Sequence, residues 1–478
     1  MSLDVYKYFF LFFYFFVGAC EGSPISFGLK TQIWQHMWHN GKDITFLTLE
    51  ARDKNVSDLE RKWKYSEANL NEYKNLGAQW NLVTIEQGVD GPDDFARAER
   101  IFSEHANRHI KVGVRLIADP ETYGNQVKLE SYKQWIKAFT EHFSEKVFFY
   151  AIENEIDHAV GINNGAVSKP VNFENYSHLF RVAYDTIRSI SPNAIVLDHG
   201  VSAFSLGLAV TYDKWREEGS DEAFHFWIQF INGHGEAASS KEKLKKLLFH
   251  SDSLNRINIA VETISELERG YFQLHYYFNP DALQELIDWI YNKMENSHSI
   301  RPIIATEIGY RLPRKKMFSL KNPLGKTIGD YNKYDQQEHA VFMVKIFVIL
   351  FSEGVDIVQY WQMRFHHDRS TTARLYRANN NPEYFEANAA ALAFRKLTKT
   401  LSEMNFLILN EQDGIREFRF TNGHAVIWSM EGCLKIDETW FLSILKVENI
   451  YGDSVENFGV GCVAEVGIPL YIYYRQSE

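Results

Sequence analysis

The 478-residue sequence lacks the motifs that usually mark metal and nucleotide chemistry. It has only three cysteines, and it contains no Cys-x-x-Cys pair, glycine-rich phosphate loop or His-Glu-x-x-His segment. The net charge of −11 and the lack of a long Lys/Arg run argue against a nucleic-acid partner. The densest basic cluster, KEKLKK at residues 241–246, has the spacing of the solvated face of a helix. We therefore expect no cofactor, no metal ion and no nucleic acid.

The N-terminus lacks a membrane span of ordinary length. Its apolar run, YFFLFFYFFVGAC at residues 8–20, is shorter than the roughly 20 residues that cross a bilayer and is typical of a signal peptide. The last four residues, Val17 to Cys20, resemble a lipobox, in which the cysteine receives lipid. We expect a signal segment at residues 1–20 and a protein that is secreted or lipid-anchored on the outer side of a membrane. A short anchor helix that stays attached is the alternative.

The two remaining cysteines both lie near the C-terminus. Cys433 and Cys462 would form either a disulfide in an exported protein or two buried free thiols. Asn55 and Asn175 begin glycosylation sequons, which matter only in a eukaryotic host.

From residue 26 to residue 402, short apolar runs alternate with segments that carry apolar residues at helical spacing. Eight strand signals, each followed by a helix, predict an α/β fold, a (β/α)₈ or TIM barrel. Two connections are long, and at the C-terminal face of a barrel such loops shape the site. They cover residues 200–270 and 309–332. The expected strands are near residues 28–34, 80–86, 110–117, 147–153, 194–198, 271–277, 302–307 and 356–361.

The pattern changes after about residue 403. Short alternating runs such as GIREFRF and HAVIWSM are separated by Gly, Asn and Asp. This pattern predicts a small C-terminal antiparallel β-domain, sandwich-like, over residues 403–478.

Two glutamates end predicted strands in the same way. Glu155 follows the apolar run of the fourth strand in FYAIENEID, and Glu307 follows that of the seventh in PIIATEIGY. A lone acid at a strand end is usually a helix cap or a solvated group. Two acids at matching ends of strands four and seven would instead face each other across one barrel mouth. Glu153 competes with Glu155 as the acid, but from strand alternation we expect it to point elsewhere.

These residues resemble the large clan of retaining glycoside hydrolases built on (β/α)₈ barrels. In that clan an Asn-Glu pair ends strand four and a Glu ends strand seven. The resemblance covers residues 26–400 and implies that Glu155 is the acid/base and Glu307 the nucleophile. It also implies supporting roles at the substrate for residues on strands four, six and eight, namely Asn154, His275, Tyr277 and Trp361.

The implied roles follow the chemistry of glycoside cleavage with retention. Two carboxyl groups about 5 to 5.5 Å apart are needed, one protonated and one ionised. Asn154 would bind the sugar 2-hydroxyl, Tyr277 would donate to Glu307, and Trp361 would stack under the sugar. The alternative is that His275, Tyr277 and Trp361 are ordinary buried side chains of the barrel.

The sequence also departs from the clan. Many members follow Asn-Glu with Pro, where this chain has Ile156, and many carry an arginine near the end of strand two. Here the nearest arginine is Arg115 on strand three, and we expect it to reach Glu307 from there. The family within the clan stays open.

The predicted function is an exported glycosidase that acts on an oligo- or polysaccharide, and two alternatives remain. One is a carbohydrate-binding barrel without turnover. The other is a metal-dependent barrel hydrolase, although the first strand lacks the His-x-His that such sites use. Its candidate ligands are Asp198, His199, His366, His367 and Asp368.

Overall fold

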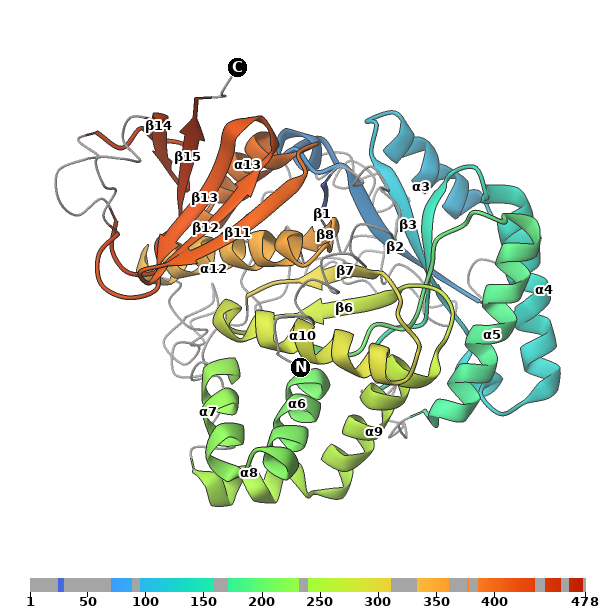
Figure 1. The fold of residues 1–478 in the computed structure, drawn as a ribbon. Coiled ribbons are helices and arrows are strands. Elements are labelled where there is room, and N and C mark those ends of the chain that lie inside the picture. Colours follow the sequence, from blue (N-terminus) through green and yellow to red (C-terminus); the bar gives the residue numbers. More distant parts are fainter. Residues whose placement is uncertain are drawn as a thin grey trace, which may run out of the picture.

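The computed structural model describes residues 25–29, 70–87, 95–157, 171–231, 240–310, 333–360, 376–377, 386–434, 443–456 and 464–475 (Figure 1). Eight strands form one sheet in which every pairing is parallel. Their bounds agree closely with the sequence prediction, and the short first strand starts two residues early. The strands are β1 (Ser26–Leu29), β2 (Trp80–Glu86), β3 (Lys111–Ile117), β4 (Val147–Ile152), β5 (Val196–Leu197), β6 (Phe272–Tyr276), β7 (Ile303–Ile308) and β8 (Ile357–Tyr360).

The sheet closes on itself. The strand order runs β5-β4-β3-β2-β1-β8-β7-β6, so β5 and β6 are its two ends. Parallel bridges from Leu197 to Tyr271 and from Val201 to Leu274 join these ends. A closed ring of parallel strands with helical connections is a (β/α)₈ barrel, as predicted.

Helices cover the outside of the ring. Residues 70–75 are helical before β2, and α3 (Ala96–Ala106), α4 (Gln126–Phe143) and α5 (Phe173–Ile190) follow the next three strands. The long connection after β5 holds four helices, where the sequence predicted only some helical material. They are α6 (Ala203–Glu217), α7 (Ser220–Ile231), α8 (Lys241–Leu248) and α9 (Ser251–Glu266). The later strands are followed by α10 (Leu283–Asn296), α12 (Lys333–Ser352) and α13 (Ala389–Leu401).

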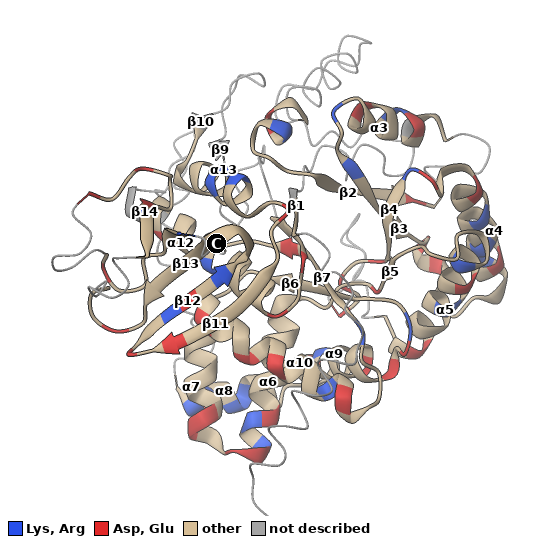
Figure 2. Cartoon of the chain, turned by 45° about the horizontal axis from the view of Figure 1, so that its top comes forward, with Lys and Arg blue, Asp and Glu red and all other residues tan. Residues whose placement is uncertain are grey.

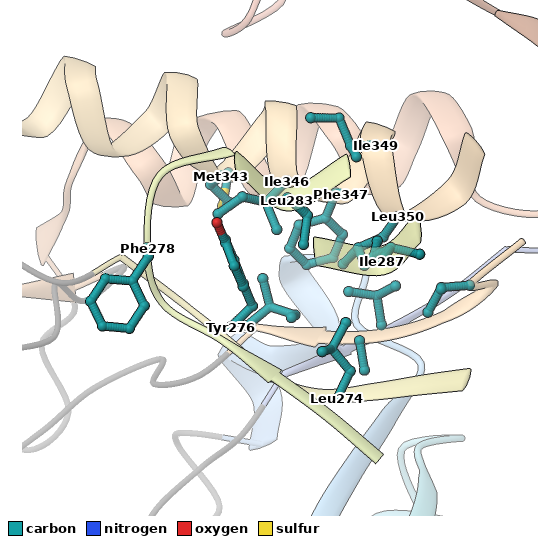
Figure 3. Close-up of a cluster of buried hydrophobic side chains, with 14 of the residues drawn as sticks. Leu274, Tyr276, Phe278, Leu283, Ile287, Met343, Ile346, Phe347, Ile349 and Leu350 are labelled. Carbon is teal, nitrogen blue, oxygen red and sulfur yellow. The ribbon is translucent and has the colours of Figure 1, made fainter. Parts of the chain in front are cut away.

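Strand alternation divides the side chains between the barrel interior and the helix layer. Phe149 and Ala151 of β4 pack inside with Trp80, Leu82 and Ile304. On β6, Leu274 and Tyr276 point outward and pack with α10 and α12 (Figure 3). The intervening residue, His275, therefore faces the interior, as does Tyr277 beyond it.

After α13 the chain forms a five-stranded antiparallel sheet. Its order is β11-β12-β13-β15-β14, and β11 was not predicted. One face shares an apolar core with α12 and α13 through Phe418, Trp428 and Tyr471, so the boundary at residue 403 stays a prediction. The described strands give one sheet and not the pair that a sandwich needs. They are β11 (Phe406–Gln412), β12 (Ile415–Phe420), β13 (His424–Ser429), β14 (Ile444–Asn449) and β15 (Leu470–Tyr474).

Three further predictions concern the ends and the surface. Cys433 is disulfide-bonded, and its partner lies outside the described residues, as do residues 1–20, where a signal segment was predicted. Within the described ranges, no helix has the length and apolar character to span a bilayer. Basic and acidic side chains are mixed over the outer helices α4 to α9 (Figure 2).

Candidate active site

Glu155 and Glu307 meet at the mouth of the barrel. Glu155 lies three residues past the end of β4, and Glu307 is the fifth residue of β7. One oxygen of each carboxyl lies within 4.8 Å of the other and of a ring nitrogen of His275. The Glu155 side chain is 20% exposed and that of Glu307 is 5% exposed. The geometric prediction of two carboxyls facing each other across the mouth is confirmed.

An irregularity in β7 turns Glu307 inward. Ala305 and Ile308 both pack in the outer layer, so strict alternation would turn Glu307 outward as well. The register shifts between Ala305 and Ile308 against β8, and between Leu274 and His275 against β6. Such a bulge re-aims a side chain, and here it brings Glu307 opposite His275.

Two donors hold the Glu307 carboxylate. Arg115 on β3 donates from Nη2 to Oε1 at 2.7 Å, and both side chains are buried. The hydroxyl of Tyr277 donates to Oε2 at 2.6 Å. Burial and the charge of Glu307 raise the pKa of Tyr277 well above its usual value, so its hydroxyl stays a donor. Arginine and tyrosine together favour the ionised form of Glu307. The predicted reach of Arg115 from strand three is confirmed.

His275 holds the other carboxyl. Its Nδ1 lies 2.8 Å from Glu155 Oε1, and its Nε2 lies 2.9 Å from the amide nitrogen of Gln273 and 3.2 Å from the hydroxyl of Thr306. We assign the ring proton to Nδ1, because the Gln273 amide nitrogen is placed as a donor to Nε2, and Nδ1 then donates to Glu155. His275 therefore holds one oxygen of Glu155, whose side chain stays partly exposed.

Arg115 and His275, which were both counted among the substrate-binding candidates, lie deeper than the two carboxyls. Both side chains are buried, at 2% and 0% exposure, so they lie behind the two carboxylates. We assign them positioning roles. Asn154 is half-buried, and its Oδ1 is a buried atom without a hydrogen-bond partner among the described residues, so its predicted role at the substrate stays a prediction. Trp361 lies outside the described residues.

Glu153 points away from Glu155, as expected, but for a reason that the sequence did not reveal. Alternation alone would turn both toward the interior, because they are two residues apart. Both have a left-handed backbone instead, with φ of 71° at Glu153 and 45° at Glu155. Such values are uncommon outside glycine and cost on the order of 1–3 kcal/mol each. Glu153 is thereby turned into the layer between the sheet and the outer helices.

Burial makes Glu153 an unusual carboxyl. It accepts a 2.6 Å hydrogen bond from the backbone N–H of Ala118 and is 2% exposed. Desolvation raises its pKa to about 7, against which the Ala118 hydrogen bond and the Arg115 charge act only in part. Its remaining neighbours are one carboxyl and three tyrosine hydroxyls, from Glu86, Tyr123, Tyr132 and Tyr176.

The raised pKa of Glu153 predicts a pH-dependent stability difference between the wild type and Glu153→Gln. Its folded-state pKa lies above the unfolded value of 4.5, so its contribution is fully present below pH 4.5 and is lost as the pH rises through about 7. Ionising it in the fold costs about 3 kcal/mol, which glutamine avoids. We expect thermal unfolding midpoints of the two proteins to agree near pH 4.5 and the variant to be more stable above pH 8. A difference between the two unfolding midpoints that stays constant at all pH values would contradict the raised pKa of Glu153.

The site carries few of the features of a metal centre. Glu155, His275 and Glu307 have suitable atoms, but the Nδ1 proton of His275 bonds Glu155 and the Arg115 cation already faces Glu307. The rival ligands that the structure describes are engaged elsewhere. Asp198 binds Arg301, and His199 contacts Thr263. The remaining rival residues, His366, His367 and Asp368, lie outside the described residues.

The comparisons with known proteins show the fold. No protein-family model and no curated protein matches the sequence. Among solved structures, a family 39 glycoside hydrolase from Bacteroides cellulosilyticus is similar at a TM-score of 0.54 and 11% identity, over 95% of this chain and 82% of its own. A monomeric beta-xylosidase from Caulobacter crescentus is similar at a TM-score of 0.51 and 12% identity, over 87% and 93%. The chain thus has the TIM-barrel architecture found in glycoside hydrolases.

Proposed function

We propose that this protein is a retaining O-glycosidase that cleaves β-linked glycosides or polysaccharides through a covalent glycosyl-enzyme intermediate. The observation that carries the proposal is the pair formed by Glu155 and Glu307, with carboxyl oxygens within 4.8 Å of each other. Retaining enzymes place the two groups about 5–5.5 Å apart, whereas inverting enzymes separate them by about 6.5–9.5 Å. The similarity of the fold to glycoside hydrolases agrees with this chemistry but does not supply it.

In the first step Glu307 attacks the anomeric carbon while Glu155 protonates the leaving oxygen. Arg115 and Tyr277 both donate to Glu307, so this carboxylate keeps its negative charge and its orientation. We assign Glu155 the role of the acid, because among the described residues Arg115 contacts Glu307 and not Glu155. His275 occupies Oε1 of Glu155, which leaves Oε2 to carry the transferred proton.

In the second step Glu155 removes a proton from water, and the resulting nucleophile releases the sugar from Glu307. The Nδ1 proton of His275 stabilises the ionised Glu155 at this stage. Asn154 would bind the 2-hydroxyl of the sugar, a contact that strengthens at the oxocarbenium-like transition state. Trp361 is proposed as the platform under the sugar ring.

The proposal is tested by a panel of aryl glycosides and polysaccharides with NMR analysis of the first product. Cleavage with a β-configured product supports it, and an α-configured first product contradicts the role of Glu307. Binding of glycans without cleavage would favour a carbohydrate-binding barrel instead.

Tyr277→Phe is expected to lower kcat by about 10- to 100-fold. The change removes one hydrogen bond to a charged group, worth about 1.5–3 kcal/mol. Tyr276→Phe is a matched control, because its hydroxyl donates to the carbonyl of Asn279 and the ring lies in the outer core. Steady-state kinetics of both variants should separate them, and equal losses would contradict the assignment of Tyr277.

We also propose that the protein is exported. The N-terminal apolar run and the disulfide at Cys433 support an oxidising compartment. More specifically, we propose that the exported protein carries a lipid on Cys20. The mass of the mature N-terminal peptide tests export and lipid attachment together. Removal of residues 1–19, with the mass of a lipid added to Cys20, indicates a lipoprotein.

A further inference from the structure

Residues 153–155 are held between two neighbouring strands. The N–H of Glu153 donates to the carbonyl of Leu116 on β3 at 3.1 Å, and its carboxyl accepts from Ala118 just beyond β3 at 2.6 Å. On the other side, the N–H of Glu155 donates to the carbonyl of His199 beyond β5 at 2.8 Å. The tripeptide is therefore attached to β3 at its first residue and to the β5 side at its last.

The attachment coincides with strained backbone. Seven non-glycine residues in the described part of the chain have positive φ, and two of them are Glu153 and Glu155. Strained residues persist only where their surroundings over-determine them. Here the strain has a use, since it separates two carboxyls that alternation would place on one face. One carboxyl is then buried in the outer layer, and the other is delivered to His275.

We infer that Glu153 is a positioning residue for Glu155. It acts through the hydrogen bond that its carboxyl accepts from the backbone N–H of Ala118. The effect of Glu153 on catalysis rests on the proposed function, in which Glu155 is the acid/base. The bond closes the left-handed turn onto β3, and that turn sets the direction in which Glu155 leaves the sheet. Without it, the turn can relax toward an extended strand, which would rotate the Glu155 side chain away from His275.

Two variants separate the reach of Glu153 from its charge. Glu153→Gln keeps an oxygen at the same distance and removes the charge. Glu153→Asp keeps the charge, but it is one methylene shorter and does not reach Ala118. We expect the glutamine variant to keep activity within about threefold of wild type. A displacement of about 1 Å can cost on the order of 100-fold in rate, so the aspartate variant should lose about that much.

The loss should depend on the leaving group. Glu155 is needed as an acid only for poor leaving groups, so kcat/KM on an alkyl glycoside should fall in Glu153→Asp while kcat/KM on a dinitrophenyl glycoside stays within about threefold. A general structural defect would lower both alike. Equal losses on both substrates, wild-type behaviour of the aspartate variant, or a selective loss in the glutamine variant would each overturn the inference.

A structural readout is independent of turnover. In crystals of Glu153→Asp we expect the 2.8 Å contact between His275 Nδ1 and Glu155 to be lost, and in crystals of Glu153→Gln we expect it to remain. An intact contact in the aspartate variant overturns the inference even if no substrate is found. Absence of any glycoside cleavage by the wild type would instead count against the proposed function. If Glu153→Asp does not fold, the test is the crystal structure of Glu153→Gln. Loss of the contact between His275 and Glu155 in that structure overturns the inference, and retention of the contact supports it.

Discussion

Replacing Glu307 with glutamine is expected to lower kcat by about 10⁵-fold or more on every substrate while the barrel stays folded. Glutamine has the shape of glutamate, but its neutral amide cannot attack the anomeric carbon. Its oxygen can still accept from Arg115, so the local packing survives. Circular dichroism and thermal unfolding would establish the fold, and kinetics with an activated aryl glycoside would measure the loss.

The buried charge of Arg115 complicates this variant and calls for a matched control. Glu417 in the C-terminal sheet is also buried, and it also accepts from an arginine and a tyrosine, Arg419 at 2.8 Å and Tyr474 at 2.5 Å. Glu417→Gln should lower stability without changing kcat. Activity of Glu307→Gln within a few fold of wild type would refute its role as nucleophile.

Adding azide to the Glu307→Ala variant gives a stereochemical test of the same role. In Glu307→Ala a small anion fits where the carboxylate was and attacks from the same face of the sugar. Azide should therefore restore turnover of an activated β-glycoside and yield the α-glycosyl azide. Production of the β-azide from this variant would mean that another group performs the first attack.

Replacing Glu155 with alanine is expected to produce the second large effect, which depends on the leaving group. A general acid contributes about 10²–10⁴-fold. We therefore expect losses of that size in kcat/KM on alkyl or sugar leaving groups and nearly none on dinitrophenyl glycosides. The second step loses its base as well, so the glycosyl-enzyme should accumulate and appear as a burst of released phenol.

His275 and the geometry of Glu155 agree with the acid and base roles that we propose for this one residue. One oxygen is held by His275 and the side chain is 20% exposed, so we propose that the second oxygen gives and then takes the proton. Azide should accelerate the second step in Glu155→Ala and yield the β-azide, the opposite anomer to that from Glu307→Ala. A uniform loss across leaving groups would contradict the acid role.

The sequence contained enough to place the two carboxyls. Each follows an apolar run of strand length, and the closed parallel ring puts the ends of β4 and β7 at one mouth. The donor from Tyr277 was also predictable, because it lies two residues beyond His275 on the same face of β6. Arg115 was identified as the arginine nearest to the strand-two position of the clan, and it reaches Glu307 from β3 on the opposite side of the ring.

Other parts of the site depend on backbone geometry that the local sequence pattern does not predict. The register shift in β7 turns Glu307 inward against simple alternation, and the left-handed turns at Glu153 and Glu155 separate two carboxyls that the pattern would place together. Gln273 and Thr306, which fix the ring of His275, look like ordinary polar residues in buried strands. The only signal available was their burial next to a catalytic position. The four helices after β5 were underestimated in part because α6 is a nearly continuous buried segment from Ser205 to Thr211 without an exposed face at helical spacing.

The most direct test of the central claim is to trap the glycosyl-enzyme with a slow 2-fluoro-glycoside of the preferred sugar and to map the labelled peptide by mass spectrometry. The account predicts a single adduct on the carboxyl of Glu307, within contact of Glu155. An adduct on any other residue, or steady turnover without an adduct and with an inverted product, would contradict it.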